Sequence, residues 1–195
     1  MSYKIEKGFL VHNGKKVFAI GQSYYPSFHK YKFPVPPEGD RIGEMKKDIA
    51  QMREVGFNHI RFAAIGNTRL ENDKLLVDTP LVDQMIEEAD KNDISISVRL
   101  QGYTPNLRSR DDVRMVDNLG VGLDPNVWYN FIQSSMCNPN IIADDRTLVE
   151  GLTKHYEQYA NVVGYQIYNE PHYPREKVYD YSPSVCEKYK EWLVE

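Results

Sequence analysis

The sequence predicts an α/β fold built on a parallel sheet. Three observations support this prediction: apolar segments with strand composition alternate with segments of helical spacing, a short hairpin comes first, and no glycine-rich phosphate loop follows a strand. Alternating strands and helices form parallel sheets with right-handed crossovers. The missing phosphate loop disfavours the nucleotide-binding sheets of this class.

The first expected element is a small hairpin at residues 9–20, FLVHNGKKVFAI, in which two apolar runs flank an Asn-Gly pair typical of a two-residue turn. Its second half, from Val17, leads into the first core strand. The motif QSYYP and a proline-rich, aromatic loop follow. The aromatic side chains, Tyr24 and Tyr25 among them, either pack this loop or form a wall on which a sugar stacks.

A helix at 41–55 and a strand at 57–64 form the next unit. Apolar side chains recur on one face of the helix, and Gly56 is a natural stop. The strand reads FNHIRFAA and carries Arg61 inside an apolar run. A buried arginine needs a carboxylate or several acceptors. Structural pairing would meet that need, but a position in the carboxyl half of a strand favours a functional site.

The third unit has a helix that starts at Thr79-Pro80, a hydroxyl cap followed by proline, and a strand at 94–100. A long connection follows at 102–139. Connections of this length are usually functional or carry small helices. The aromatic residues in it make Trp128 a further candidate for sugar contact.

The fourth unit combines a helix at 145–159 with a strand at 162–168. A last helix opens at Ser182-Pro183. Three side chains at helical spacing are expected to face inward from it: Val185, Tyr189 and Trp192.

The end of the fourth strand is the strongest functional candidate. The run VVGYQIYNEP has the composition of a strand covered on both faces, and its proline ends the strand. An ionisable residue at this end lies where α/β barrels place their chemistry. Glu170 is either a solvated loop carboxylate or a site residue. The apolar run, the neighbouring Asn169 and the equal parity of Gln166 favour the site.

Composition limits the function classes. The 195 residues suggest one domain, 1–195, and 41% hydrophobic with 27% charged residues allow a packed core. The net charge of −4 comes without a basic stripe, so nucleic acid and anionic membranes are not expected partners. Two cysteines are too few for a disulfide framework or a four-thiolate zinc site. Without a signal peptide or membrane span, we expect a cytoplasmic protein with reduced thiols.

Several motifs together resemble a known family. They are GQSYYP, MKKDIAQMREVGFNHIRFA, CNPNIIADD, YANVVGYQIYNEP and SPSVCEKYKEWLVE. Over nearly the whole chain they resemble the catalytic barrel of clan A glycoside hydrolases, and most closely the family 42 β-galactosidases. The resemblance implies a parallel (β/α) barrel of TIM type, of which this chain holds about the first four strand-helix units after the hairpin.

The resemblance also implies a reaction and a set of site residues. It implies retaining hydrolysis of terminal β-galactosides or related β-glycosides without a cofactor. Glu170 would be the general acid/base, Asn169 would bind the sugar 2-hydroxyl, and Arg61 would hold the nucleophilic carboxylate. Desolvation among apolar neighbours would keep Glu170 partly protonated near neutrality, as an acid catalyst requires. An amide offers both a donor and an acceptor to a hydroxyl.

The chain departs from family 42 in three respects. Pro171-His172 follows the glutamate where the family more often has an aromatic residue and glycine, which leaves the substrate open. The zinc-binding cysteines of some members are represented at most by Cys137 and Cys186, so no structural metal is expected. The nucleophile, a glutamate that ends the seventh strand in the family, has no counterpart here, and we expect the isolated chain to be inactive.

Two other functions stay open at this point. One is a family 5-like endo-β-glycanase, and the other is a non-catalytic half-barrel that binds carbohydrate or dimerises. The open sheet edges and a bare inner face, expected to be apolar, would be covered by a second copy or by the remainder of the barrel.

Overall fold

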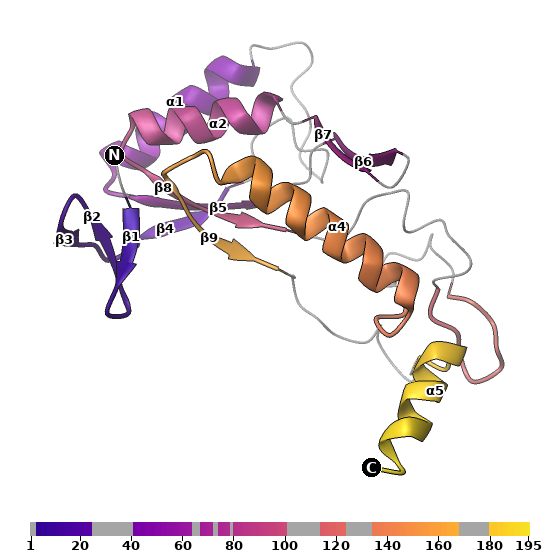
Figure 1. Ribbon diagram of the computed structural model, residues 1–195. Coiled ribbons are helices and arrows are strands. Elements are labelled where there is room, and N and C mark those ends of the chain that lie inside the picture. The colour runs from indigo at the N-terminus through magenta and orange to yellow at the C-terminus, as the bar shows by residue number, and fades with distance from the viewer. Residues whose placement is uncertain are drawn as a thin grey trace. The chain divides into compact units, whose positions relative to one another are not determined.

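The structure is a computed structural model that describes residues 3–24, 41–63, 67–71, 74–78, 80–100, 114–123, 134–167 and 180–195 (Figure 1). The chain divides into two compact units, which are described separately. The first comprises Met1–Thr68, Val77–Gln101 and Leu152–Ile167, and the second comprises Arg69–Leu76, Gly102–Gly151 and Tyr168–Glu195.

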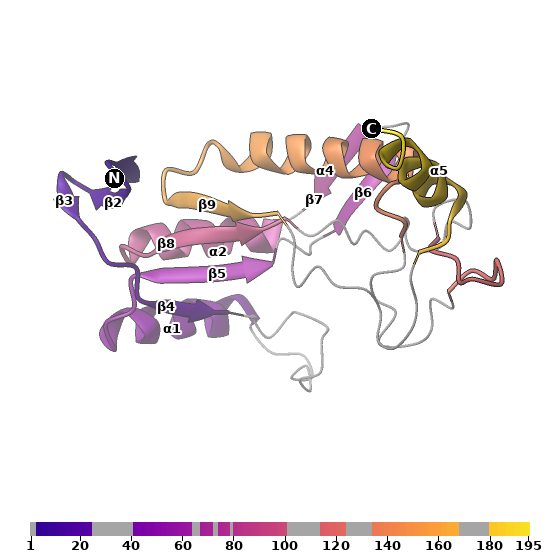
Figure 2. The same cartoon turned by 90° about the horizontal axis from the view of Figure 1, so that it is seen from below.

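The first unit contains the predicted parallel sheet. Four strands pair in the order β4-β5-β8-β9, and every pairing is parallel. Figure 2 shows their arrows pointing the same way. Their bounds are β4 (Gly21–Ser23), β5 (His59–Ala63), β8 (Ser95–Arg99) and β9 (Val162–Gln166). The prediction of parallel strands in chain order is therefore confirmed.

Two helices, α1 (Arg41–Glu54) and α2 (Pro80–Lys91), cover one face of this sheet (Figure 1). Their apolar side chains recur with helical spacing and pack on a strand face of isoleucine, valine and phenylalanine. The buried members are Met45, Ile49, Met52, Val82, Met85, Ile86, Ala89, Ile60, Phe62, Ile96 and Val98. Val55, the last residue of the helix predicted at 41–55, is exposed, and the helix ends one residue earlier, at Glu54.

The hairpin predicted at the start of the chain is present and belongs to a three-stranded antiparallel sheet. Its strands are β1 (Tyr3–Glu6), β2 (Phe9–His12) and β3 (Lys15–Lys16). Asn13 and Gly14 form the turn with φ values of 48° and 77°, the left-handed conformation that such a turn requires. The sequence reading missed β1.

The first core strand begins later than the predicted start at Val17. Residues 17–20 have no regular structure, and β4 begins at Gly21. A Cβ atom at position 21 would lie 1.7 Å from the carbonyl oxygen of His59, so only glycine lets β4 approach β5 this closely.

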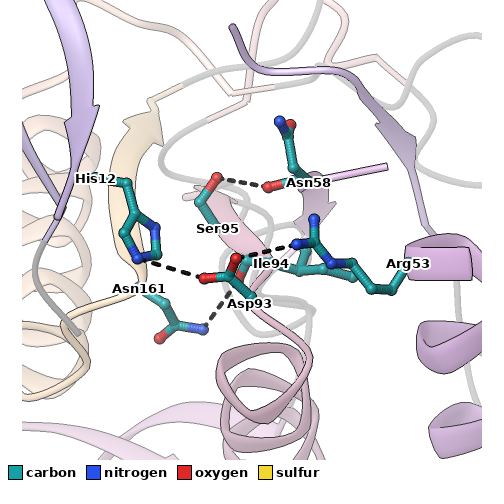
Figure 3. Close-up of polar contacts among 7 residues, drawn as sticks. All are labelled: His12, Arg53, Asn58, Asp93, Ile94, Ser95 and Asn161. Carbon is teal, nitrogen blue, oxygen red and sulfur yellow. Dashed lines mark hydrogen bonds and ion pairs between the residues drawn. The ribbon is translucent and has the colours of Figure 1, made fainter. Parts of the chain in front are cut away.

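Two asparagines fasten the amino ends of the strands. The Asn58 side chain accepts a hydrogen bond from Ile20 N at 2.8 Å and donates one to Phe18 O at 3.0 Å. Asn161, 1% exposed, donates to Ile86 O at 2.9 Å. It also donates to Ile94 O at 3.4 Å (Figure 3). The Asn161 contact satisfies a buried backbone carbonyl, whereas the Asn58 contacts are exposed. Both asparagines lie at the end of the sheet opposite the expected site.

Three further elements lie between strands of the parallel sheet along the chain. β6 (Asn67–Glu71) and β7 (Lys74–Asp78) form a two-stranded sheet that the sequence did not predict. α4 (Pro139–Tyr156) begins six residues before the predicted position, with Pro139 in its first turn, where the missing N–H costs nothing.

The last helix, α5 (Pro183–Trp192), belongs to the second unit and begins after Ser182, as predicted. The expected inward orientation of its apolar face is wrong for the described structure. Tyr189 and Trp192 are 57% and 65% exposed and stack on each other with centroids 5.8 Å apart. Helical spacing identifies a face, but it does not say what covers that face.

Candidate active site

The face of the sheet opposite α1 and α2 is polar. Paired residues in a parallel sheet point to the same side, and Arg61 pairs with Ser23 on β4 and with Ser97 on β8. Alternation along each strand then assigns seven polar side chains to this face. They are Ser23, His59, Arg61, Ser95, Ser97, Arg99 and Gln166. The expectation of an apolar inner face is therefore wrong.

Two hydrogen bonds of Arg61 reach the two outermost strands of the described sheet. Its Nε donates to Gln166 Oε1 on β9 at 2.5 Å, and its Nη1 donates to Ser23 Oγ on β4 at 2.7 Å. The sequence predicted that this arginine would need a carboxylate or several acceptors, and Ser23 and Gln166 are two neutral acceptors of its guanidinium. The guanidinium therefore lies on the polar face, oriented from both sides.

His59 and Ser95 lie below Arg61, nearer the amino ends of the strands. His59 Nδ1 is 2.9 Å from Ser95 Oγ, and that hydroxyl donates to Asn58 O at 3.0 Å. Burial lowers the pKa of His59 below its ordinary value, so the imidazole is neutral at pH 7. It does not add a second positive charge next to Arg61.

Tyr24, a predicted sugar contact, is directed toward the helices. Its side chain is 7% exposed, and its hydroxyl donates to Asp48 Oδ2 on α1 at 2.7 Å. Burial and this carboxylate raise the pKa of the phenol. Ser23 and Tyr24 alternate in direction, so Tyr24 lies on the side opposite Arg61 and packs against α1. The structure gives no support to a sugar contact at this position.

The other predicted site residues, Glu170, Asn169, Tyr25 and Trp128, lie outside the described residues. β9 ends at Gln166, two residues earlier than predicted. The sequence puts Asn169 and Glu170 three and four positions after that end. Their convergence with Arg61 stays a prediction.

No metal site is formed by the described residues, in which no three His, Cys, Asp or Glu side chains come together. Cys137 and Cys186 form no disulfide, and both side chains are partly buried. No helix within the described ranges is long and apolar enough to cross a membrane.

Sequence reasoning singled out Arg61 and Gln166 but not their contact, and it missed Ser23. Neither pairing has a signal in the sequence alone, because Arg61 and Gln166 are 105 positions apart and only the strand register brings them together. A polar residue next to the first predicted strand was the one available indication.

Comparisons with known proteins agree with this geometry. The model of glycoside hydrolase family 42, described as beta-galactosidase, matches residues 35–195. A β-galactosidase from the Antarctic haloarchaeon Halorubrum lacusprofundi is 19% identical with a TM-score of 0.68, covering 91% of this chain and 25% of that one. A β-galactosidase from Bacillus circulans sp. alkalophilus is 18% identical with a TM-score of 0.63, covering 89% and 23%. A search of the curated proteins finds no match.

Because their identity to this chain is low, the two solved structures are evidence for the fold alone. They are much longer proteins, and the chain spans about a quarter of the length of each. Together with the four parallel strands, they show that the sheet is part of a TIM-type (β/α) barrel, as the sequence predicts.

Proposed function

Since the chain belongs to the β-galactosidases of glycoside hydrolase family 42, we propose that it forms the amino-terminal half of a retaining β-galactosidase barrel and supplies its acid/base, Glu170. The supporting observation is the orientation of Arg61. Its charge is held on the polar face, at the middle of β5, by Ser23 and Gln166. A cation fixed at this position suits a carboxylate that must stay ionised to act as a nucleophile.

The proposed reaction needs two carboxyl groups about 5 Å apart. Glu170 would protonate the oxygen of the leaving group and later remove a proton from the attacking water. Asn169 would hold the 2-hydroxyl of the sugar. A second glutamate would attack the anomeric carbon and form the glycosyl-enzyme intermediate.

The second glutamate would come from the remainder of the barrel. In the described sheet, β4 and β9 are the outermost strands, and in a closed barrel each would pair with a further strand. The polar inner face fits this assignment, because it would line an enclosed site instead of packing a dry dimer interface. The remainder of the barrel is therefore the proposed partner, with a second copy as the alternative.

Hydrolysis of an aryl β-galactoside tests the proposal. Residues 1–195 alone should show negligible turnover, and the same residues joined to the missing strand-helix units of a family 42 barrel should be active. Glu170→Gln in the completed barrel should remove most of this activity, and Glu6→Gln, an exposed carboxylate on β1, serves as the control. Full activity of the isolated chain as a monomer would contradict the proposal.

A further inference from the structure

The row of residues around Arg61 leaves room for its long side chain. Arg61 pairs with Ser97 on β8, and Ser97 pairs with Gly164 on β9. On the other side, Arg61 pairs with Ser23. Each neighbour in this row is small. A Cβ atom at position 164 would already lie 3.4 Å from Ser97 Oγ, so a larger side chain there would fill the space next to β8.

This space lets Arg61 extend across β8 to β9. Its Nε donates to Gln166 on β9. Gln166 pairs with Arg99, whereas Gly164 pairs with Ser97, so Gln166 lies two residues nearer the carboxyl end of β9 than Gly164. The Arg61 side chain therefore crosses one complete strand before it meets its acceptor. On the other side, its Nη1 is bound by Ser23 on β4.

Two acceptors at different nitrogens fix the plane of a guanidinium. The group is rigid and planar, so a bond at Nε and a second at Nη1 determine the direction of all its other N–H groups. Ser23 and Gln166 are neutral, so these two acceptors orient the guanidinium without themselves cancelling its charge. A charged group held in advance loses little freedom when it binds a carboxylate.

We propose that Ser23 and Gln166 are positioning residues that clamp the Arg61 guanidinium for a carboxylate at the carboxyl ends of the strands. The identity of that carboxylate, the nucleophile of the reaction, rests on the proposed function. The clamp itself rests on the strand register and the two hydrogen bonds. Gly164 belongs to the same device, because it leaves the path from β5 to β9 open.

Hydrogen exchange of the Arg61 Nε–H group, followed by ¹H–¹⁵N NMR of the chain, tests the clamp. Gln166→Ala should speed this exchange by about tenfold, the loss expected for one hydrogen bond to a charged group. Gln166→Glu keeps an acceptor oxygen at the same place and should restore slow exchange. Ser23→Ala should also speed the exchange of the Arg61 Nε–H, but by less than Gln166→Ala does. Ser97→Ala, in the same row, is the matched control and should change nothing.

Exchange of the backbone amides in β5 and β8 shows whether each variant is folded. If Gln166→Ala loses that protection, the Gln166→Glu and Ser23→Ala variants decide in its place. Equal Arg61 exchange in Gln166→Ala and Ser97→Ala would overturn the inference, as would Gln166→Glu exchanging as fast as Gln166→Ala. A slowly exchanging Arg61 in a completed barrel that cleaves no β-galactoside would contradict the proposed function and leave the clamp intact.

Discussion

His12 Nε2 lies 3.4 Å from Asp93 Oδ1, and this contact joins the amino-terminal sheet to the base of the parallel sheet (Figure 3). His12 is 8% exposed, and the ring of Tyr3 meets it edge-on at 4.0 Å. Arg53, at the end of α1, binds the other carboxylate oxygen at 3.1 Å. Burial first, and then Asp93, raises the pKa of Tyr3 to about 12. The Asp93 carboxylate, in the turn between α2 and β8, thus links this turn to β2 and to α1.

Substitutions of Asp93 should separate the charge from the backbone conformation. Asp93 has a φ of 57°, which asparagine tolerates and alanine does not. Asp93→Asn should cost less than about 1 kcal/mol, because the side chain is partly exposed and its ion pairs are screened. Asp93→Ala adds backbone strain and should cost about 1–2 kcal/mol more. Urea unfolding measures both, and equal costs would show that backbone strain at this turn is negligible.

Gly21→Ala should be among the most damaging small substitutions in the chain. The added methyl group would overlap the His59 carbonyl at 1.7 Å, and β4 would have to separate from β5. We expect a loss of more than about 3 kcal/mol, or failure to fold. Gly14→Asn is the control, since its left-handed conformation suits asparagine and nothing lies within 4 Å. A thermal midpoint for Gly21→Ala equal to that of the control would refute the close approach.

Asp145 on α4 should make stability depend on pH. Burial first, and then Asp144, raises the pKa of Asp145 from 3.8 to about 6. The folded state therefore holds this proton more tightly than the unfolded state, and the stability it provides is lost as the pH rises from about 4 to about 6.

Asp145→Asn should remove this loss. After allowance for solvent screening, it should stabilise the protein by about 1 kcal/mol at pH 7 and by little at pH 4. Urea midpoints at the two pH values are the measurement. Glu187→Gln, on exposed α5, is the matched control. A gain of the same size at both pH values would show that the charge of Asp145 is not the cause.

The sequence predicted the parallel sheet and the faces of α1 and α2 because both depend on local periodicity. Met45, Ile49 and Met52 recur with the spacing that buries them, and the strands read as apolar runs. The turn at Asn13 and Gly14 could also be predicted from the sequence, because few residues adopt its backbone conformation.

The contacts of the candidate site could not be predicted from local sequence patterns. The bonds from Arg61 to Ser23 and Gln166 depend on strand register, which a bulge between Ile96 and Ser97 shifts by one residue. Tyr24 was a candidate for a sugar-stacking wall, but it follows Ser23 by one position and therefore points to the opposite face, where its hydroxyl binds Asp48. The orientation of α5 depends on whatever packs against Tyr189 and Trp192, and no periodicity encodes that.

The role of Glu170 as acid/base is the central claim, and the dependence of its substitution on the leaving group tests it most directly. In the completed barrel, the loss of kcat/KM in Glu170→Gln is measured on phenyl β-galactoside and on 2,4-dinitrophenyl β-galactoside. A phenol leaving group needs protonation, so we expect a loss of about 10²–10⁴-fold there. The dinitrophenyl group leaves without help, and the loss in kcat/KM should be far smaller. Equal losses on the two substrates, or no loss on either, would contradict the account.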